Sequence, residues 1–293
     1  MPTSLPDGLI PGGRFTDWTP AKPSYVVADV DGTLIKEGTT ATPVVARAVS
    51  AATAAGLHVG FATGRLPAGL TDLDAQLQLA GPHIVHNGAQ VREHGTALHT
   101  WSIEPAVARE LVDWCLSVGV YAEFYVGDEF FVTDRRADAQ SGWDLISGEP
   151  HGLISDMDWD TAALIKATVV AYQGRELPEL LVALRRLPVV AEPSTSPMFP
   201  GDQFINVTSP EADKGRAVAW VADHLGFGLD EVVAVGDGVN DLSMLAVAGT
   251  AIAMGQAEAA VQAVAHLVVP EVDADGLAHA LAAAARWRTS PIR

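Results

Sequence analysis

Residues 25–33 read YVVADVDGT, and this stretch decides the fold. The apolar run Tyr25–Ala28 has the length and composition of a strand buried on both faces. Asp29 follows it directly, and Asp31 comes two residues later, so in extended backbone both carboxylates can point the same way. Two carboxylates this close repel each other unless a cation or a proton intervenes. The stretch therefore predicts a buried strand that ends in a pair of reactive acids.

Taken alone, DVDG is equally typical of an Asx turn closed by Gly32. An EF-hand loop is disfavoured, because no closing glutamate follows and a strand, not a helix, precedes. The case for chemistry at Asp29 therefore depends on what the rest of the chain brings to the same place.

Two further apolar runs end in polar, glycine-containing turns. These are Leu57–Ala62 before TGR (63–65) and His83–Val85 before HNGA (86–89). Alanine-rich or amphipathic helix patterns separate the runs, from Pro43 to Gly56 and from Pro67 to Gly81. Alternation of strands and helices predicts parallel βαβ units.

The same alternation of strands and helices returns near the C-terminus. Helices are expected at 214–228, 240–249 and 273–287, and strands at 231–237, 250–254 and 266–270.

The region between, 91–199, differs in composition and in the length of its expected elements. It holds every tyrosine except Tyr25. Its short candidate strands are 121–126, 129–133, 165–172 and 189–192, and its candidate helices are 105–118 and 175–187. The sequence predicts an α/β protein: a Rossmann-like parallel-sheet core from 24–90 and 200–293, a smaller α/β domain inserted at 91–199, and a loose or draped N-terminal arm over 1–23.

A second polar cluster lies in VVAVGDGVND, residues 232–241. Asp237 ends a strand, and Asn240 and Asp241 open the next helix, where capping that helix is the simpler role. Ligands of open α/β sheets bind outside the carboxyl ends of the strands, so Asp237 is expected to face Asp29. A hard cation such as Mg²⁺ takes oxygen ligands of this kind from more than one segment.

Two weaker signals concern phosphate. Thr63 and Gly64 sit between a strand and a helix start, where a hydroxyl and backbone N–H groups make an anion nest, although Thr-Gly is common in ordinary turns. Lys214 begins a helix, a position the helix dipole disfavours, although a solvated surface lysine is the default explanation. If Lys214 lies in a pocket instead, its positive charge would offset the negative charge of a bound phosphate.

Bulk properties exclude several classes of function. The chain has 293 residues, 48% of them hydrophobic, and a formal charge of −18, which disfavours nucleic acids and anionic membranes as partners. The single cysteine, Cys115, rules out an internal disulfide and a thiolate metal cluster. We see no apolar run of membrane-spanning length and no secretory h-region, and expect a cytoplasmic protein without membrane contact.

In this order, DVDGT, TGR, DKG (213–215) and GDGVND (236–241) resemble the phosphatases of the haloacid dehalogenase (HAD) superfamily. NGA (87–89) and AIAMGQA (251–257) look like its Cof-type sugar-phosphatase branch, in which an α/β cap lies between the second and third motifs. The resemblance covers 24–90 and about 200–287. It departs at Gln256, where the family often has asparagine, and we expect a small effect on loop shape there.

The resemblance implies a role for each matching residue. Asp29 would attack phosphorus, and Asp31 would protonate the leaving alcohol and then activate water. Mg²⁺ would be held by Asp29, the Asp31 carbonyl and Asp237, with Asp241 in support. The phosphoryl oxygens would be bound by Thr63, Gly64, Lys214 and Asn240. The substrate would be touched by Arg65, His86 and Asn87, with Trp101, Trp114, Trp143 and Trp159 as weaker candidates in the cap.

The expected function is thus a magnesium-dependent phosphatase of a small phosphorylated metabolite, acting as a monomer or homodimer. A sugar phosphate and a phosphorylated cofactor both remain open as substrates. A phosphomutase or phosphotransferase on the same core is the alternative, since it differs mainly in what accepts the phosphate. A catalytically silent metabolite-binding protein is a further alternative, because a fold does not guarantee activity.

Overall fold

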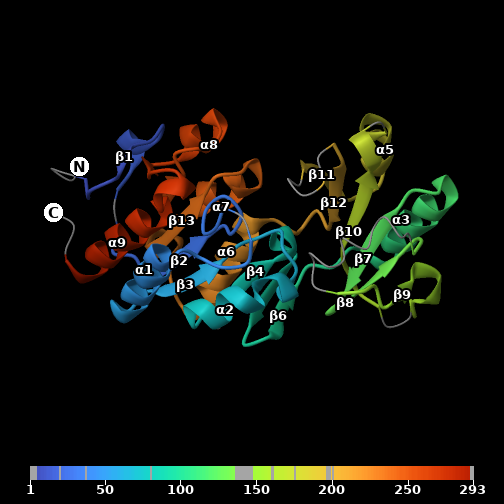
Figure 1. Cartoon of the computed structure of the whole chain (residues 1–293), viewed down its shortest axis with the longest axis horizontal. Helices are drawn as coiled ribbons and strands as arrows, with labels where there is room; N and C mark the ends of the chain where they lie inside the picture. The colour runs from blue at the N-terminus through green and yellow to red at the C-terminus, as the bar shows by residue number, and fades with distance from the viewer. Residues whose placement is uncertain are drawn as a thin grey trace. The chain divides into compact units, whose positions relative to one another are not determined.

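The computed structural model describes residues 5–19, 21–36, 38–79, 81–135, 148–159, 162–174, 176–195, 199 and 201–290. The chain divides into two compact units (Figure 1). The core unit comprises 1–99 and 213–293, and the inserted unit comprises 100–212.

The core unit is built on a six-stranded sheet in which the strands that carry Asp29 and Asp237 are neighbours. Its order is β1 (Ile10–Pro11), β15 (Leu267–Val268), β14 (Thr250–Ala253), β13 (Val232–Gly236), β2 (Tyr25–Ala28) and β3 (His58–Phe61). All neighbours are parallel except β1 and β15. Every residue of β2 and β13 is buried, as expected for central parallel strands covered on both faces. The predicted α/β fold with a parallel sheet is confirmed.

Helices cover this sheet. They are α1 (Pro43–Ala54), α2 (Thr71–Leu77), α6 (Lys214–Leu225), α7 (Leu242–Val247), α8 (Ala259–Val264) and α9 (Gly276–Thr289). Helix α1 starts where the sequence predicts, because Thr42 accepts a hydrogen bond from the Val45 N–H and Pro43 occupies the first turn. Helices α1 and α9 lie against each other (Figure 1), and their buried residues Val49 and Ala280 join one apolar cluster with the sheet.

The third apolar run does not extend the parallel sheet as predicted. Strand β4 (His83–Val85) pairs antiparallel with β5 (Gln90–Glu93), which adjoins β6 (Thr96–Thr100) in a separate three-stranded sheet. An isolated parallel bridge, Ala62 to Ile84, and a hydrogen bond from the Thr63 N–H to the Ile84 carbonyl at 2.9 Å link it to the chain after β3. The turn at 86–88 sends the chain back along one edge of β4 as β5, and on the other edge the parallel pairing is limited to this bridge among the described residues.

The inserted unit is a six-stranded sheet with helices on one face. The strand order is β11 (Val190–Thr195), β12 (Gln203–Thr208), β10 (Leu164–Ala171), β7 (Ala122–Val126), β8 (Glu129–Val132) and β9 (Gly152–Leu153). Phe124, Ala167 and Ile205 on one face share an apolar cluster with residues of α3 (Pro105–Val118) and α5 (Leu177–Leu184).

The unit boundaries differ from the expected 91–199. Strand β12 lies between β10 and β11, so residues 200–212 belong with the inserted unit. Strand β5 pairs with β4, so residues 91–99 belong with the core unit. The composition gave no sign that β12 pairs with the distant β10, nor that β5 folds back on β4.

The N-terminal segment is packed against the core, not loose. Strand β1 pairs with β15, and Trp18, only 4% exposed, donates from its indole nitrogen to the Thr250 hydroxyl at 3.0 Å. Its ring also contacts Trp287, with centroids 5.4 Å apart. The prolines and glycines suggested a loose or draped arm; the described part of the segment is draped on the core, and Trp18 was the signal of its anchoring.

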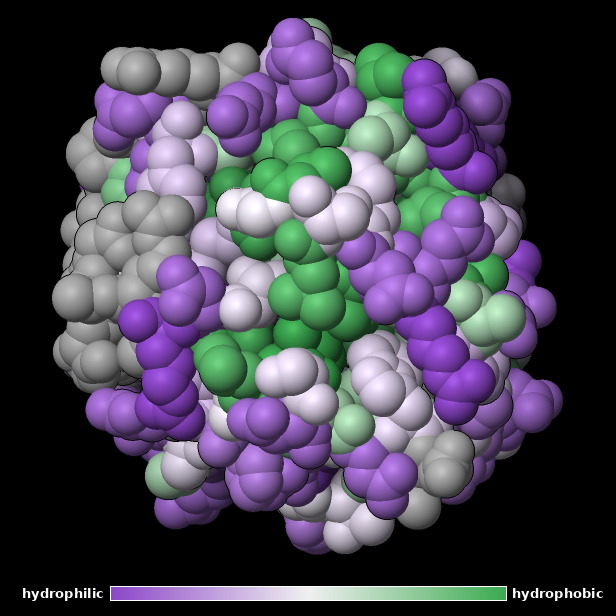
Figure 2. Space-filling view, turned by 90° about the vertical axis from the view of Figure 1, so that its right-hand side faces the viewer, coloured by the Kyte–Doolittle hydropathy of each residue, from purple (hydrophilic) through white to green (hydrophobic). Residues whose placement is uncertain are grey.

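The helices of the inserted unit leave large apolar side chains on the surface. Leu116 and Val118 of α3 and Val182 of α5 are all exposed. On the face shown in Figure 2, apolar side chains gather at the centre and polar ones surround them. None of the described helices combines the length and hydropathy needed to cross a membrane.

Candidate active site

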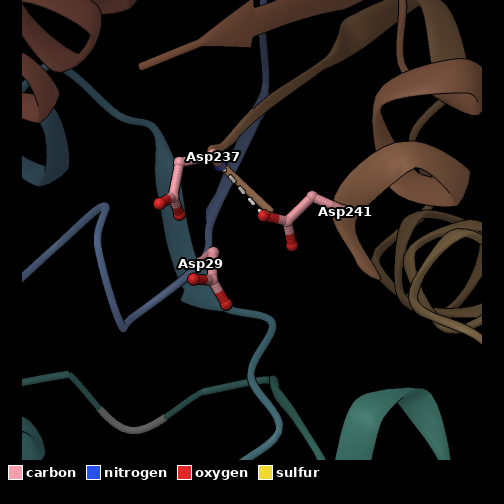
Figure 3. A group of neighbouring side chains, drawn as sticks. All are labelled: Asp29, Asp237 and Asp241. Atoms are coloured by element: carbon pink, nitrogen blue, oxygen red, sulfur yellow. Dashed lines mark hydrogen bonds between the residues drawn. The ribbon is translucent and has the colours of Figure 1, made fainter. Parts of the chain in front are cut away.

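Three carboxylates meet at the carboxyl ends of the central strands. Asp29 follows β2, Asp237 follows β13, and Asp241 ends the short turn Val239–Asp241 that leads into α7. One oxygen from each lies within 4.8 Å of the other two, and Figure 3 shows the three side chains turned toward a common space. Because β2 and β13 are parallel neighbours, their ends bring together acids 208 positions apart, 237 − 29, in the sequence.

Asp241 is fixed by the backbone that precedes it. Its Oδ2 accepts from the N–H groups of Asp237 and Gly238, each at 3.0 Å. A Cβ at residue 236 would lie 2.5 Å from that oxygen, so only glycine fits there. Through the contact with Gly238 its carboxylate caps the turn Val239–Asp241 that leads into α7, although it makes no side-chain cap of α7 itself. The second oxygen is left to face Lys214.

Lys214 bridges two of the carboxylates. Its Nζ donates to Oδ1 of Asp29 and to Oδ1 of Asp241, both at 2.6 Å, and the residue is 1% exposed. Asp213 caps helix α6 by accepting from the Arg216 N–H at 2.9 Å, which fixes the helix start that carries the lysine. Lys214 is therefore not a solvated surface lysine.

Burial and mutual repulsion dominate the electrostatics of the cluster. Burial raises the pKa of the Asp29 carboxyl to about 8; the Lys214 ammonium opposes the rise, and Asp241 adds to it. Burial and Asp241 also raise the pKa of Asp237. Burial alone would lower the pKa of Lys214, but Asp241 and Asp29 together raise it. One ammonium thus faces three carboxyl groups, an arrangement that a divalent cation would balance.

Asp31 does not join the three carboxylates through its side chain, and the predicted metal ligand at this residue is its backbone carbonyl. Arg65 holds it instead, with Nε 2.9 Å from Oδ2 and Nη2 2.6 Å from Oδ1. The same guanidinium donates to the carbonyls of Gly38 at 3.0 Å and Gly69 at 3.3 Å. Arg65, expected to touch substrate, is occupied in positioning Asp31.

The TGR and HNG turns are bound to each other beside the cluster. Thr63 is fully buried, and its hydroxyl accepts from the Arg65 N–H at 3.1 Å. Its carbonyl accepts from the Asn87 N–H at 2.9 Å, and a Cβ at Gly64 would lie 2.7 Å from the Asn87 amide oxygen. That oxygen is buried and accepts no hydrogen bond from the described residues. The two turns therefore form one rigid rim.

The remaining predicted residues lie in different settings. His86 is 1% exposed with a positive φ of 54°, so it is a buried part of the turn. Asn240 is exposed, on the turn next to Gly238. Trp114 and Trp159 pack against the apolar cluster of the inserted unit. Trp143 lies outside the described residues.

Two residues that contact the site had no role assigned from the sequence. The Thr33 hydroxyl donates to Oδ1 of Asp237 at 3.0 Å. Gln256 donates from Nε2 to the Gly32 carbonyl at 2.5 Å and to Oδ2 of Asp237 at 3.3 Å. The small effect on loop shape expected at Gln256 stays a prediction, and the structure adds these two contacts to it. Both residues lie in the quoted motifs, so their position was the available signal.

Comparisons with known proteins agree with this geometry. The family of haloacid dehalogenase-like hydrolases matches residues 26–281. The 5-amino-6-(5-phospho-D-ribitylamino)uracil phosphatase YwtE of Bacillus subtilis is 25% identical over 87% of this chain and 95% of its own. Phosphatase YwpJ of the same organism is 25% identical over 87% and 97%. The solved structure of the HAD subclass IIB sugar phosphatase BT4131 is 26% identical, with a TM-score of 0.73 over 88% of this chain and 98% of that one.

Proposed function

The chain belongs to the haloacid dehalogenase-like hydrolases, in the Cof-type branch, and we propose that it is a magnesium-dependent phosphatase acting on a small phosphorylated metabolite through a phosphoaspartate at Asp29. The observation that carries the proposal is the Lys214 ammonium placed 2.6 Å from both Asp29 and Asp241. Such an arrangement brings a nucleophile and fixed positive charge to one point, which phosphoryl transfer requires more than it requires a strong acid.

Asp29 is the proposed nucleophile. Its carboxylate oxygen would form a bond to phosphorus as the bond from phosphorus to the substrate oxygen breaks, giving an acyl phosphate on Asp29 and an alcohol. Asp31, when protonated, would give its proton to the leaving oxygen. Asp31 would then take a proton from the water that attacks phosphorus, and inorganic phosphate would leave with the Asp29 carboxylate restored. Arg65 orients Asp31 by donating to both of its oxygens, and one of these contacts would open when Asp31 takes up its proton.

The donor set fits magnesium. Asp29, Asp237 and Asp241 offer only oxygen ligands, which hard cations prefer. Together the three carboxylates carry more negative charge than the one ammonium among them, that of Lys214, can neutralise. We propose that these residues hold the ion together with the Asp31 backbone carbonyl. When bound, magnesium would supply positive charge to the phosphoryl oxygens. Thr33 and Gln256 would hold Asp237 in its orientation.

Phosphate binding is assigned to the rim beside Asp29. Lys214 would offer its remaining hydrogen-bonding capacity, and Thr63, Gly64 and Asn240 would contribute the hydroxyl, backbone and amide groups. Asn87 is placed toward substrate because its buried amide oxygen has no hydrogen bond from the described residues. The relatives' names support a small organic phosphate as the substrate class.

The test is an assay of phosphate release from a panel of small phosphate esters and an aryl phosphate, with magnesium and with chelator. We expect release only with magnesium, lost in Asp29→Asn and retained in Asp72→Asn, a matched change at an exposed aspartate. Absence of release from every ester, by folded wild-type protein that binds magnesium, would overturn the proposal and favour a transferase or a binding protein.

A further inference from the structure

The two helices of the inserted unit expose a face that combines apolar and charged side chains. Leu116 and Val118 of α3 are 46% and 53% exposed, and Val182 of α5 is 56% exposed. These are three of the seven large apolar side chains exposed among the described residues, so such side chains are concentrated here. We name the set the helical face: Glu110, Asp113, Trp114, Leu116 and Val118 of α3, Val182 of α5, and Arg185 and Arg186 directly after α5.

The exposed residues of each helix include an apolar side chain next to a charge. In an α-helix, residues three or four positions apart are neighbours on the same surface. Asp113 therefore lies beside Leu116 on α3, and Val182 lies beside Arg185 at the end of α5. The opposite sides of both helices are buried in the apolar cluster of the inserted sheet. The charge presented to solvent is thus negative on α3 and positive at the end of α5.

The charges of the helical face make no ion pair within the part of the chain that the structure describes. Glu110 and Asp113 are exposed and unpaired there, and the same holds for Arg185 and Arg186. Acidic residues outnumber lysines and arginines by 36 to 18, so acids to neutralise an exposed arginine are plentiful in this chain. Two adjacent arginines are nevertheless left unpaired on one helix, and two acids on the other. The two sets are complementary and are not joined within one chain.

We propose that the helical face binds a second copy of this chain, with α3 of each copy against α5 of the other. An antiparallel alignment of the two helices sets Leu116 on Val182 and Asp113 on Arg185 together, because in each helix the two residues are three positions, about 4.5 Å, apart. The twofold symmetry of such a dimer makes every contact occur twice. Trp114, half-buried on the same face, supplies the kind of large side chain that anchors interfaces.

Charge favours a second copy over other occupants. The chain has a formal charge of −18, so two copies repel each other, and salt screens that repulsion beyond about 10 Å. Close contact then requires opposite charges set against each other, which Glu110 and Asp113 facing Arg185 and Arg186 provide in both directions. An acidic partner would meet the acids of α3, and a basic partner would meet the arginines after α5. The same chain matches both, and the inference does not depend on the phosphatase activity proposed for the core unit.

The test uses two charge-reversal variants of the full chain. The basic variant, Glu110→Arg with Asp113→Arg, carries positive charge on both helices, and the acidic variant, Arg185→Glu with Arg186→Glu, carries negative charge on both. We expect wild type to dimerise reversibly in sedimentation velocity as its concentration is raised to about 200 μM, and each variant alone to dimerise at least about tenfold more weakly. An equimolar mixture of the two variants is expected to recover the dimer, because each α3 then faces an α5 of opposite charge.

The control variant, Arg47→Glu with Arg286→Glu, makes the same change in net charge as the acidic variant at exposed arginines of the core unit. Its dimerisation is expected to stay within about twofold of wild type. Circular dichroism checks that each variant is folded. Should a charge-reversal variant not fold, Leu116→Ser with Val182→Ser, which keeps every charge, is expected to weaken the dimer by itself.

Three results would overturn the proposal. One is a wild-type protein that stays monomeric throughout the concentration series. Another is a dimer that the two charge-reversal variants weaken no more than the control does, which would place the interface elsewhere on the chain. The third is a mixture of the folded basic and acidic variants that stays monomeric, which would contradict the pairing of α3 with α5.

Discussion

The core unit and the inserted unit each bury a lysine, and they treat it in opposite ways. Lys214 donates to two carboxylates at 2.6 Å, which raise its pKa against the effect of burial. Lys166 has near it one carboxylate that already accepts from two phenols, and its pKa falls to about 8. The first charge holds the reacting acids in place. For the second, burial outweighs the nearby Glu123 carboxylate in setting the pKa.

The comparison is informative because cations are scarce in this chain. It has 18 lysines and arginines against 36 acidic residues, and only four of those 18 are lysines, Lys22, Lys36, Lys166 and Lys214. A lysine withdrawn from the surface leaves a protein of formal charge −18 with less positive charge facing water. Burial thus removes two of the four lysines from the surface, and it does so in two different electrostatic environments.

The largest expected effect comes from removing the core lysine. Lys214→Met leaves Asp29 and Asp241 facing each other without their shared donor, and it removes a donor for phosphoryl oxygens. We expect kcat/KM to fall by about a hundredfold to a thousandfold, as for loss of one preorganised donor. Steady-state kinetics with Lys36→Met as the control measure this. Retention of more than a tenth of the activity would show that Lys214 is not part of the phosphate site.

The next effect concerns stability at alkaline pH and isolates the second lysine. The pKa of Lys166 is about 8 in the folded protein and 10.5 in the unfolded chain. Between these values the unfolded state binds more protons, so unfolding free energy rises with pH; below about 8 the penalty for burying the charge is fully present. The rise attributable to Lys166 is up to about 3 kcal/mol.

Urea unfolding of wild type and Lys166→Met from pH 7 to pH 10 measures that difference. We expect the variant to be the more stable at pH 7 and its advantage to shrink as pH approaches 10. Lys36→Met, at an exposed position, is expected to track wild type throughout. A gap between wild type and Lys166→Met that stays constant with pH would mean that Lys166 keeps its ordinary proton affinity in the folded state.

A smaller effect is expected at Gln256, which tests whether the core site is organised around a metal. Gln256→Met removes donors to the Gly32 carbonyl and to Oδ2 of Asp237. Loss of a partner that orients a ligand costs about tenfold in metal affinity. Calorimetric titration with magnesium measures it, and Gln78→Met, at an exposed glutamine outside the site, is the control. Unchanged magnesium affinity would mean that Asp237 does not depend on Gln256 for its orientation.

The smallest effect is expected at the arginine that holds Asp31. Arg65→Lys keeps the charge and loses the two-point contact, so we expect kcat to fall by about threefold to tenfold with little change in KM. Steady-state kinetics with the ester panel measure this change. An unaltered kcat would leave Arg65 as a structural contact between the two turns.

The sequence was sufficient wherever local pattern decides structure. Tyr25–Ala28 and Pro105–Val118 have the bounds that their apolar runs and caps predict, and Asp29 and Asp237 follow strands as expected. Strand-end position alone places these two acids near each other, because parallel neighbours share one edge.

What the sequence did not disclose depends on contacts distant along the chain. Strand β12 reads QFINVT and pairs with partners on both sides, one of them more than thirty residues away, so nothing local assigns it to the inserted unit. The Arg65–Asp31 pair joins two turns whose side-chain directions follow from packing, not from spacing. The anchoring of Trp18 on Thr250 is of the same kind. Such pairings are set by the whole fold, which a local pattern does not contain.

The most direct test of the central claim is to trap the covalent intermediate. Wild-type protein with magnesium and a good substrate from the ester panel is quenched in acid within one turnover, digested, and searched by mass spectrometry for a phosphoryl group on the peptide that contains Asp29. The account predicts the modification at Asp29, accumulating when Asp31→Asn slows hydrolysis and absent from Asp29→Asn. Rapid phosphate release with no modified Asp29 at any quench time, or a phosphoryl group on another residue, would contradict it.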